Sequence, residues 1–287
     1  TEIAKRLKKN MDIDGIEGTC ISSKEIPKDF YELPDFESIS KNDEQSKKNF
    51  CRMQLMFSSS KNLAQKYGNR YVLQYKMHEM KTKELDEIYE LPYSRNIPAR
   101  ADYFKGMQFS VVTHRGCFGN CSFCSLALHQ GIKIISRSEE SILNEIRKLT
   151  KHKDFRGYID DLGGPSANMY GMDCKSNCID CLNCAKLDKS HARLINLLRK
   201  ARQIKNVKKI FIRSGIRYDL AVESEEYMKE ISKHHISGCL KIAPEHSDED
   251  VLKLMNKNYL GKFKQFVKKF NEINKPLNQY LKCYFMT

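Results

Sequence analysis

Three cysteines in one short segment have the residue type and the spacing for metal chemistry. The segment HRGCFGNCSFCSLALHQG, residues 114–131, contains Cys117, Cys121 and Cys124 in the pattern CxxxCxxC. A four-iron cluster is normally held by four thiolates, so three thiolates from one loop leave one iron without a protein ligand. An open coordination position admits a substrate or cofactor, as it does in catalytic zinc sites. The spacing therefore predicts a metal centre that does chemistry.

The residues between these cysteines suit a bulky inorganic group. Gly116 and Gly119 allow the backbone to wrap closely around it, because glycine has no Cβ and adopts positive φ without a clash. Phe123 precedes the last cysteine, where an aromatic ring can lie against a flat ligand. The competing interpretation is a zinc knuckle or a buried thiol cluster, for which His114 or His129 is available as a fourth ligand.

This segment resembles the signature of the radical SAM superfamily, CxxxCxΦC with Φ aromatic. The resemblance implies that Cys117, Cys121 and Cys124 hold a [4Fe-4S] cluster whose open iron binds the amino and carboxylate groups of S-adenosylmethionine (SAM). It also implies reductive cleavage of SAM to methionine and a 5′-deoxyadenosyl radical, which abstracts hydrogen from a substrate. The electron would come from a reductant such as a flavodoxin or ferredoxin.

A second cysteine group follows in CKSNCIDCLNC, which contains Cys174, Cys178, Cys181 and Cys184. Four thiolates suit either a closed [4Fe-4S] cluster or a zinc site. We favour a second iron-sulfur cluster, because an electron relay near the first cluster has an evident use. Disulfide pairing is the least favoured option in a reducing compartment.

Composition and charge narrow the class of protein. The chain has 287 residues, 40% of them hydrophobic, enough for one large domain or two ordinary ones. We expect a cytoplasmic protein, because the eleven cysteines cluster at metal-ligand spacings and no signal peptide or membrane-length apolar run is apparent. The net charge of +14 comes mostly from dispersed lysines. Nucleic acid is therefore not the favoured partner, since no RNP, KH or helix-turn-helix pattern accompanies the charge.

The pattern from Met107 onward predicts alternating strands and helices. The predicted strands cover residues 107–113, 157–164, 208–215, 238–246 and 279–286. The predicted helices cover residues 136–152, 189–204, 223–235, 248–257 and 262–273. Ser136 with Glu139 forms a capping-box pattern, and Ser247 resembles the cap of a later helix. Such alternation predicts a parallel sheet. Five units fall short of a closed eight-stranded barrel.

The resemblance to radical SAM enzymes implies an open, partial (β/α)6 barrel, which would be truncated after the fifth strand in this chain. We assign residues 104–287 to this core, with the four-cysteine insertion at 174–184. Residues 1–103 are predicted to be a small polar α+β lead-in and connector. Within it we expect a helix in 41–68, a strand over 69–76 and an extended connector over 90–103.

Functional residues of a parallel barrel lie on the loops after its strands. The second strand ends in Gly163 and Gly164, where the radical SAM family has a Gly-Gly-Glu whose backbone contacts the amino group of SAM. In this chain Pro165 stands at the third position, so the resemblance to this motif covers only the two glycines. A plain turn is the alternative interpretation of this dipeptide.

The later strand exits are rich in charged groups. The third exit contains Arg213, Arg217, Tyr218 and Asp219, which are candidates for binding substrate or the SAM carboxylate. Arg217 and Asp219 could equally form a structural ion pair. At the fourth exit, the resemblance implies that Glu245 binds the ribose of SAM, and His246 follows it. The residues do not reveal which of these groups is catalytic.

A narrower resemblance comes from several segments together. RGCFGNCSFC, HQGIKIISRSEESI, DLGGPSANMYGM, SGIRYDLA and KIAPEH are similar to the YgiQ family of radical SAM proteins, over roughly residues 80–287. This resemblance implies a cofactor chemistry and no particular substrate. Residues 245–257 also resemble radical SAM methylthiotransferases, which modify tRNA. The rival from another class is a non-catalytic zinc- or iron-sulfur-binding interaction module, with nucleic acid as one partner.

Overall fold

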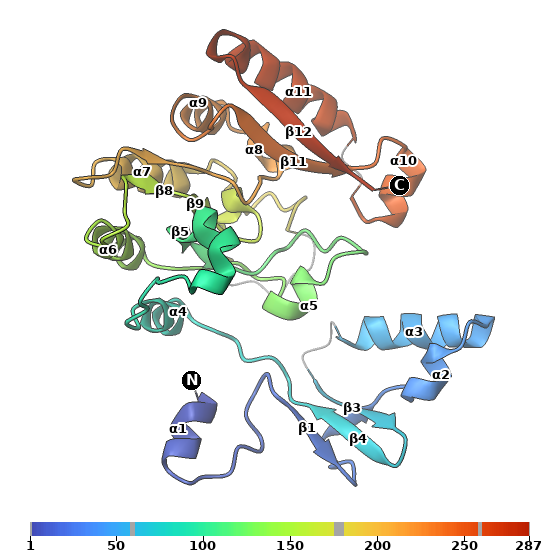
Figure 1. The fold of residues 1–287 in the computed structure, drawn as a ribbon. Helices are drawn as coiled ribbons and strands as arrows, with labels where there is room; N and C mark the ends of the chain where they lie inside the picture. Colours follow the sequence, from blue (N-terminus) through green and yellow to red (C-terminus); the bar gives the residue numbers. More distant parts are fainter. Residues whose placement is uncertain (1, 58–60, 175–180, 258–259, 287) are drawn as a thin grey trace. The chain divides into compact units, whose positions relative to one another are not determined.

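The computed structural model describes residues 2–57, 61–174, 181–257 and 260–286. The chain divides into two compact units, Thr1–Glu79 and Met80–Thr287 (Figure 1). The sequence predicts a radical SAM core that begins at residue 104. The boundary between compact units does not test that start, so it stays a prediction. No helix in the described part of the chain is long and apolar enough to cross a membrane.

The first unit is built on a four-stranded sheet with the strand order β1-β4-β3-β2. β3 and β4 form an antiparallel hairpin that closes at Tyr67 and Arg70, with Gly68 at positive φ in the turn. Met53 of α3 and Leu63 of β3 belong to its buried cluster. The elements are α1 (Glu2–Lys8), β1 (Cys20–Ser23), β2 (Phe30–Glu32), α2 (Phe36–Ser40), α3 (Glu44–Phe57), β3 (Asn62–Tyr67) and β4 (Arg70–Gln74).

The helix predicted within residues 41–68 is correct for its first part and wrong for its last. α3 ends at Phe57, and Asn62–Tyr67 forms β3 instead. β3 pairs with β2 on one side and β4 on the other, and it buries Leu63 and Ala64. Pairing with two neighbours outweighs the local sequence preference here. The strand predicted over 69–76 is confirmed as β4.

The second unit begins with α4 (Thr82–Tyr89) and a connecting segment. Residues 92–98 are irregular, in line with the predicted extended connector. The end of that prediction is wrong, because Ala99–Met107 forms the 3₁₀ helix η1. Pro98 stands immediately before η1 with φ of −61°, a value that its ring imposes and that leads readily into a helical turn.

From Ser110 onward, short strands alternate with helices (Figure 1). The strands are β5 (Ser110–Val112), β6 (His114–Arg115), β7 (Ile135–Ser136), β8 (Tyr158–Ile159), β9 (Asp161–Gly163), β10 (Lys209–Ile210), β11 (Cys239–Glu245) and β12 (Tyr280–Phe285). The helices are α5 (Leu126–Gln130), α6 (Glu139–Leu149), η2 (Ala167–Met169), α7 (Ala192–Arg202), α8 (Tyr218–Ala221), α9 (Glu225–His234), α10 (Glu249–Leu254), α11 (Leu260–Asn274) and η3 (Lys275–Leu277).

The predicted parallel pairing is confirmed strand by strand. β5 pairs in parallel with β9, β8 with β10, and β11 with β12. A parallel bridge between Ile216 and Ile242 connects the segment after β10 to β11. The five predicted strands therefore run parallel to their neighbours, and their carboxyl ends face the same edge. The class is α/β, as the alternation predicts.

Two helix caps differ from the prediction. Ser138 rather than Ser136 caps α6, and its side chain accepts a hydrogen bond from the first turn at 3.1 Å. Ser136 Oγ instead accepts a hydrogen bond from Gly171 N at 2.9 Å. Asp248 rather than Ser247 caps α10. In both helices the cap is the residue with extended backbone directly before the first helical residue, where its side chain reaches the free N–H groups.

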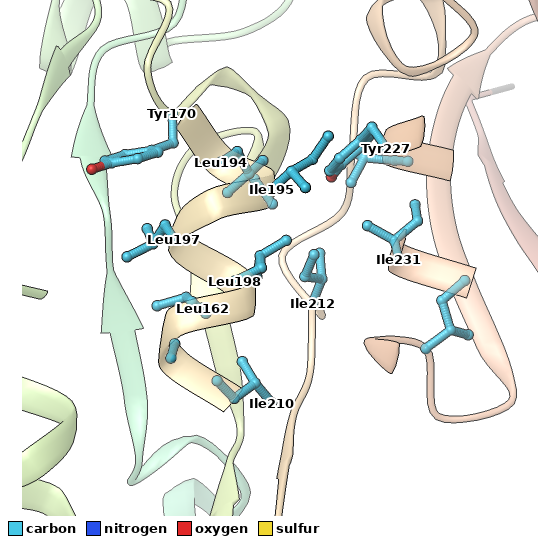
Figure 2. Close-up of a cluster of buried hydrophobic side chains, with 14 of the residues drawn as sticks. Leu162, Tyr170, Leu194, Ile195, Leu197, Leu198, Ile210, Ile212, Tyr227 and Ile231 are labelled. Atoms are coloured by element: carbon cyan, nitrogen blue, oxygen red, sulfur yellow. The ribbon is translucent and has the colours of Figure 1, made fainter. Parts of the chain in front are cut away.

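The core of the second unit lies between the strands and the apolar faces of α6, α7 and α9. The apolar stripe of α6, which consists of Ile142, Ile146 and Leu149, is buried. Figure 2 shows the adjoining cluster, with Leu162, Tyr170, Leu194, Ile195, Leu197, Leu198, Ile210, Ile212, Tyr227 and Ile231 labelled. Truncating one such leucine to alanine typically costs about 2–5 kcal/mol.

His191 and His235 are two of the three buried histidines in the described part of this unit, and the third is His114. His191 precedes α7 and stacks on Tyr227, with ring centroids 4.3 Å apart. His235 follows α9, and its Nδ1 lies 2.9 Å from Ile210 O. Burial lowers the pKa of each histidine to about 4. Both are therefore neutral in the folded protein near neutral pH.

We expect the free energy of unfolding to fall as the pH drops from 6.5 toward about 4. The reason is that the His235 ring becomes protonated in the unfolded chain but stays neutral where it is buried in the folded protein. Each unit of pKa difference corresponds to about 1.4 kcal/mol. Urea unfolding at a series of pH values measures this slope. His235→Asn should make the slope shallower, because buried His114 and His191 still contribute to it. His129→Asn, at an exposed position, should behave like the parent. A parent stability that is constant down to about pH 5 would contradict the assignment.

Candidate functional site

The cysteine loop is an excursion from a short antiparallel pair. β6 and β7 pair at His114 with Ser136 and at Arg115 with Ile135, and residues 116–134 connect them. Gly116 begins the excursion at φ of +88°, where a Cβ would collide with the carbonyl of Lys133. Only glycine fits there, because both the conformation and the available space exclude a side chain.

Hydrogen bonds hold this loop at both ends. Cys117 N donates to Gly131 O at 3.0 Å, which closes the base of the loop. Farther along, Ser122 N donates to Met255 O at 3.0 Å. Asn256 Nδ2 donates to Asn120 O at 2.8 Å. The middle of the loop is thus fastened to the turn after α10, which follows the fourth predicted strand.

Cys117, Cys121 and Cys124 are free thiols of intermediate exposure. Burial raises the pKa of the Cys117 thiol, while the Gly119 backbone and the Arg217 guanidinium oppose that shift. Across residues 2–57, 61–174, 181–257 and 260–286, no three His, Cys, Asp or Glu side chains converge on a single metal ion. A cubane binds each thiolate through a different iron, so its ligands need not converge on one point.

The donor set and the backbone around it fit an iron-sulfur cluster. Three thiols without disulfides supply the ligand type that iron-sulfur clusters use. A Cβ at Gly119 would lie 3.3 Å from Cys117 Sγ and would collide with Arg217 Nη1. The missing side chain at Gly119 therefore leaves room for the Arg217 guanidinium beside this sulfur.

Two aromatic residues of the loop take different positions. Phe118 is buried and packs with Met169, Met172 and Leu220. Phe123 is 45% exposed, so its ring is accessible to a ligand. The sequence singled out Phe123 and missed Phe118, because no local pattern distinguishes an anchoring phenylalanine from an exposed one.

Gly163 and Gly164 lie beside the strand that leads into the cysteine loop. Thr113 N donates to Gly163 O at 2.8 Å, which places the second strand exit against the first. A Cβ at Gly163 would collide with Ser214 Oγ. A Cβ at Gly164 would lie 2.5 Å from the His114 ring. Both positions thus require glycine for packing, whatever else their backbone contacts.

The four candidate residues of the third strand exit take different positions in the structure. Arg217 and Asp219 form a buried ion pair, with Nη2 and Oδ2 2.6 Å apart. Arg213 lies apart from them, because its Nη1 donates to Gly106 O at 3.2 Å. Tyr218 is 2% exposed and belongs to the hydrophobic core. Arg217 lies against the cysteine loop, where its Nη1 would collide with a Cβ on Gly119.

Asn168 connects the second and third exits and was missed from the sequence. Its Oδ1 accepts from Arg217 N at 2.8 Å, and its Nδ2 donates to Arg217 O at 3.0 Å. Asn168 is completely buried. A single asparagine in a loop gives no sequence signal for such a role, because its partner lies 49 residues away.

The fourth exit holds Glu245 in an unusual backbone conformation. Its φ is +71°, in the left-handed region that non-glycine residues rarely adopt and that is enriched at functional sites. Its carboxylate lies 3.2 Å from the Nζ atom of Lys257. His246 Nδ1 accepts a hydrogen bond from Asp248 N at 3.0 Å. Glu245 is thus fixed by its ion pair and by Met286 N, which donates to Glu245 O at 2.8 Å.

The described part of the four-cysteine insertion lies near the cysteine loop. Cys174, Cys181 and Cys184 have intermediate exposure, and Cys178 lies outside the described residues. Cys181 and Cys117 both pack against one hydrophobic cluster, which contains Phe118 and Leu182. The two cysteine groups therefore share a packing surface.

A model of the radical SAM superfamily matches residues 111–286, which include the cysteine loop and all four strand exits. The chain belongs to the radical SAM superfamily. A second model, described as radical SAM N-terminal, matches residues 1–108. Membership confirms the resemblance predicted from the cysteine spacing.

Curated relatives of this radical SAM protein carry the name UPF0313. One from Clostridium botulinum (strain ATCC 19397 / Type A) is 41% identical over an alignment of 322 residues, covering 100% of this chain and 49% of that protein. One from Methanocaldococcus jannaschii is 45% identical over 259 residues, covering 84% of this chain and 42% of that protein. The chain thus spans about half the length of the curated relatives it matches.

A solved structure of the cobalamin-dependent S-adenosylmethionine radical enzyme OxsB with aqua-cobalamin bound is also similar. Its TM-score is 0.49 and its identity is 15%, over 75% of this chain and 28% of that chain. Similarity at this level carries no argument about the fold details or the ligands of this radical SAM protein.

The close approach of His114 to Gly164 gives a test of the site's packing. We expect Gly164→Ala to destabilise the protein by about 1–3 kcal/mol, because overpacking forces a fully buried ring to move. Gly106→Ala is the matched control, since nothing lies within 4 Å of a Cβ there. Chemical unfolding of both variants measures the difference. Equal unfolding midpoints for the parent and Gly164→Ala would show that the strand exits are looser than this geometry requires.

Proposed function

We propose that this chain binds a [4Fe-4S] cluster through Cys117, Cys121 and Cys124, and uses it to cleave SAM for hydrogen abstraction from a substrate. The observation that carries the proposal is the set of three free thiols on a loop that contacts the third and fourth strand exits, in a chain of the radical SAM superfamily. When bound there, the cluster would supply the electron that breaks a carbon–sulfur bond of SAM and leaves a 5′-deoxyadenosyl radical.

The chain's own residues would orient SAM. Gly163 and Gly164 end a strand beside the cysteine loop, and we propose that their backbone contacts the amino group of SAM. Pro165 has no N–H, so it donates no hydrogen bond in this exit. Exposed Phe123 is positioned to cover a flat ligand, and Glu245 is the proposed ribose contact.

The remaining charged residues divide by their accessibility. Arg213 is exposed and His246 is partly exposed, so we retain both as proposed substrate contacts. Tyr218 and Asp219 are buried, one in the core and the other in the ion pair with Arg217. We therefore assign these two a supporting role, in which they position the exit rather than touch substrate.

We further propose that residues 104–287 form an open, partial (β/α)6 barrel of the YgiQ type. Parallel pairing of successive strands supports the barrel. Because cleavage of SAM consumes one electron, the chain needs a reductant such as a flavodoxin or ferredoxin, and we propose a cytoplasmic setting for it.

Replacing Cys117, Cys121 and Cys124 together by Ala should abolish release of 5′-deoxyadenosine from SAM, because no thiolate remains to hold the cluster. Both proteins are reconstituted anaerobically, reduced with dithionite and assayed by chromatography, with iron counted in parallel. A Cys20→Ala and Cys51→Ala double variant, changed at exposed cysteines, serves as control and should match the parent. Product release by the triple variant at the parent rate, or a parent that binds zinc and no iron, would overturn the proposal.

For the insertion we propose a second [4Fe-4S] cluster rather than zinc. The contact of Cys181 with the hydrophobic cluster behind Cys117 supports a position near the first cluster, where it could relay electrons. Cys174, Cys178 and Cys184 would complete the ligand set.

Counting iron and sulfide per chain tests the second cluster. Changing Cys174, Cys178, Cys181 and Cys184 to Ser should lower the iron content from about eight to about four atoms, given four irons per cubane. The triple alanine variant of the first loop should also keep about four, which shows that the two sites load independently. Unchanged iron in the serine variant, or loss of zinc instead, would remove the second cluster and leave the first untouched.

A further inference from the structure

A buried cation lies directly against the cysteine loop. Arg217 is 9% exposed, and its Nη1 occupies the place where a side chain on Gly119 would be. Gly119 lies between Cys117 and Cys121 in the loop. The charge of Arg217 acts on both of these thiols, and their electrostatic interaction is mutual.

The guanidinium is oriented by Asp219. Arg217 Nε lies 3.0 Å from Asp219 Oδ1, and Nη2 lies 2.6 Å from Oδ2. These contacts occupy one edge of the planar group, so the remaining nitrogen, Nη1, faces Gly119. Burial by itself would lower the pKa of Arg217, but the Asp219 carboxylate holds that pKa above its usual range. The arginine therefore stays charged next to the thiols.

The backbone of Arg217 is held as firmly as its side chain. Asn168 bonds to both its N–H and its C=O, at 2.8 and 3.0 Å. Asn168 also lies 3.2 Å from His191 Nε2 through its Nδ2. A buried, fully oriented cation of this kind costs desolvation energy, and a hydrophobic pair of similar volume would often stabilise the fold as well. Stability alone is thus a weak reason for placing a charge here.

We propose that Arg217 is a positioning residue that raises the reduction potential of the cluster held by Cys117, Cys121 and Cys124. This inference rests on the proposed function. A [4Fe-4S]²⁺ core with three thiolates carries a net charge of −1, which becomes −2 when one electron enters from an external donor; no bond forms or breaks. A fixed cation near the sulfurs stabilises the more negative state, because local charge is one of the factors that set such potentials. Asp219 limits the effect by partly compensating the cation.

Charge variants test the inference through the potential of the cluster. Arg217→Met with Asp219→Asn removes the ion pair and leaves no buried charge unpaired. Asp219→Asn alone keeps the cation and removes its compensation. Glu230→Gln is the matched control, because Glu230 is also a buried carboxylate that pairs with an arginine, Arg202. Arg202 lies on the last turn of α7, and that turn leads to the ends of the strands opposite the cysteine loop.

Each protein is reconstituted anaerobically, and its reduced fraction is followed by EPR in a redox titration without SAM. Because SAM is omitted, any binding of the SAM carboxylate by Arg217 cannot contribute to the measured potential. The parent must first show iron and the signal of a reduced cluster. If it does not, the proposed function fails, and the inference falls with it.

We expect the double variant to hold about a tenfold lower ratio of reduced to oxidised cluster at a fixed potential, which is a shift of about 59 mV to more negative values for one electron. Asp219→Asn should shift the potential in the positive direction, and Glu230→Gln should leave it unchanged. Equal potentials in the parent, the double variant and Asp219→Asn would make the ion pair purely structural and overturn the inference. Should the double variant not load iron, an unshifted Asp219→Asn overturns it by itself.

Discussion

Parallel pairing of successive strands is the constraint on which the site depends. β5 lies against β9, β8 against β10, and β11 against β12, so the segments that leave their carboxyl ends meet at one edge. Because the cysteine loop leaves the first of these ends, it can be fastened to the turn after α10 and contacted by Arg217 from a third exit. No short-range interaction could assemble these segments, since well over a hundred residues separate Asn120 from Asn256.

Close backbone approach is the second physical requirement. Gly119 admits the Arg217 guanidinium next to a thiol, and Gly164 admits the His114 ring between two strand exits. In both places a methyl group would occupy space that a buried side chain already fills. The glycines near the cysteines thus serve packing as well as ligand access, and the proposed approach of SAM to the Gly-Gly backbone comes in addition to that role.

Buried polar groups give the site its electrostatic character. Asp219 and Asn168 fix Arg217 by side chain and by backbone, which keeps a positive charge beside Cys117 and Cys121. An unpaired charge at this depth would be strongly destabilising, so the carboxylate and the cation depend on each other. The loop thus contains the proposed ligands, and the third strand exit contains the positive charge that lies beside them.

The sequence by itself determined the fold class and singled out the proposed ligands. The spacing of Cys117, Cys121 and Cys124 and the alternation of strands with helices are local patterns, because ligands in one loop and residues in one element are close along the chain. Only the tertiary structure decided that Arg217 reaches the loop while Arg213 does not, that Tyr218 is a core residue, and that Asn168 joins two exits. Those roles depend on which strands lie side by side and on the direction of each side chain at a bend, and sequence spacing encodes neither.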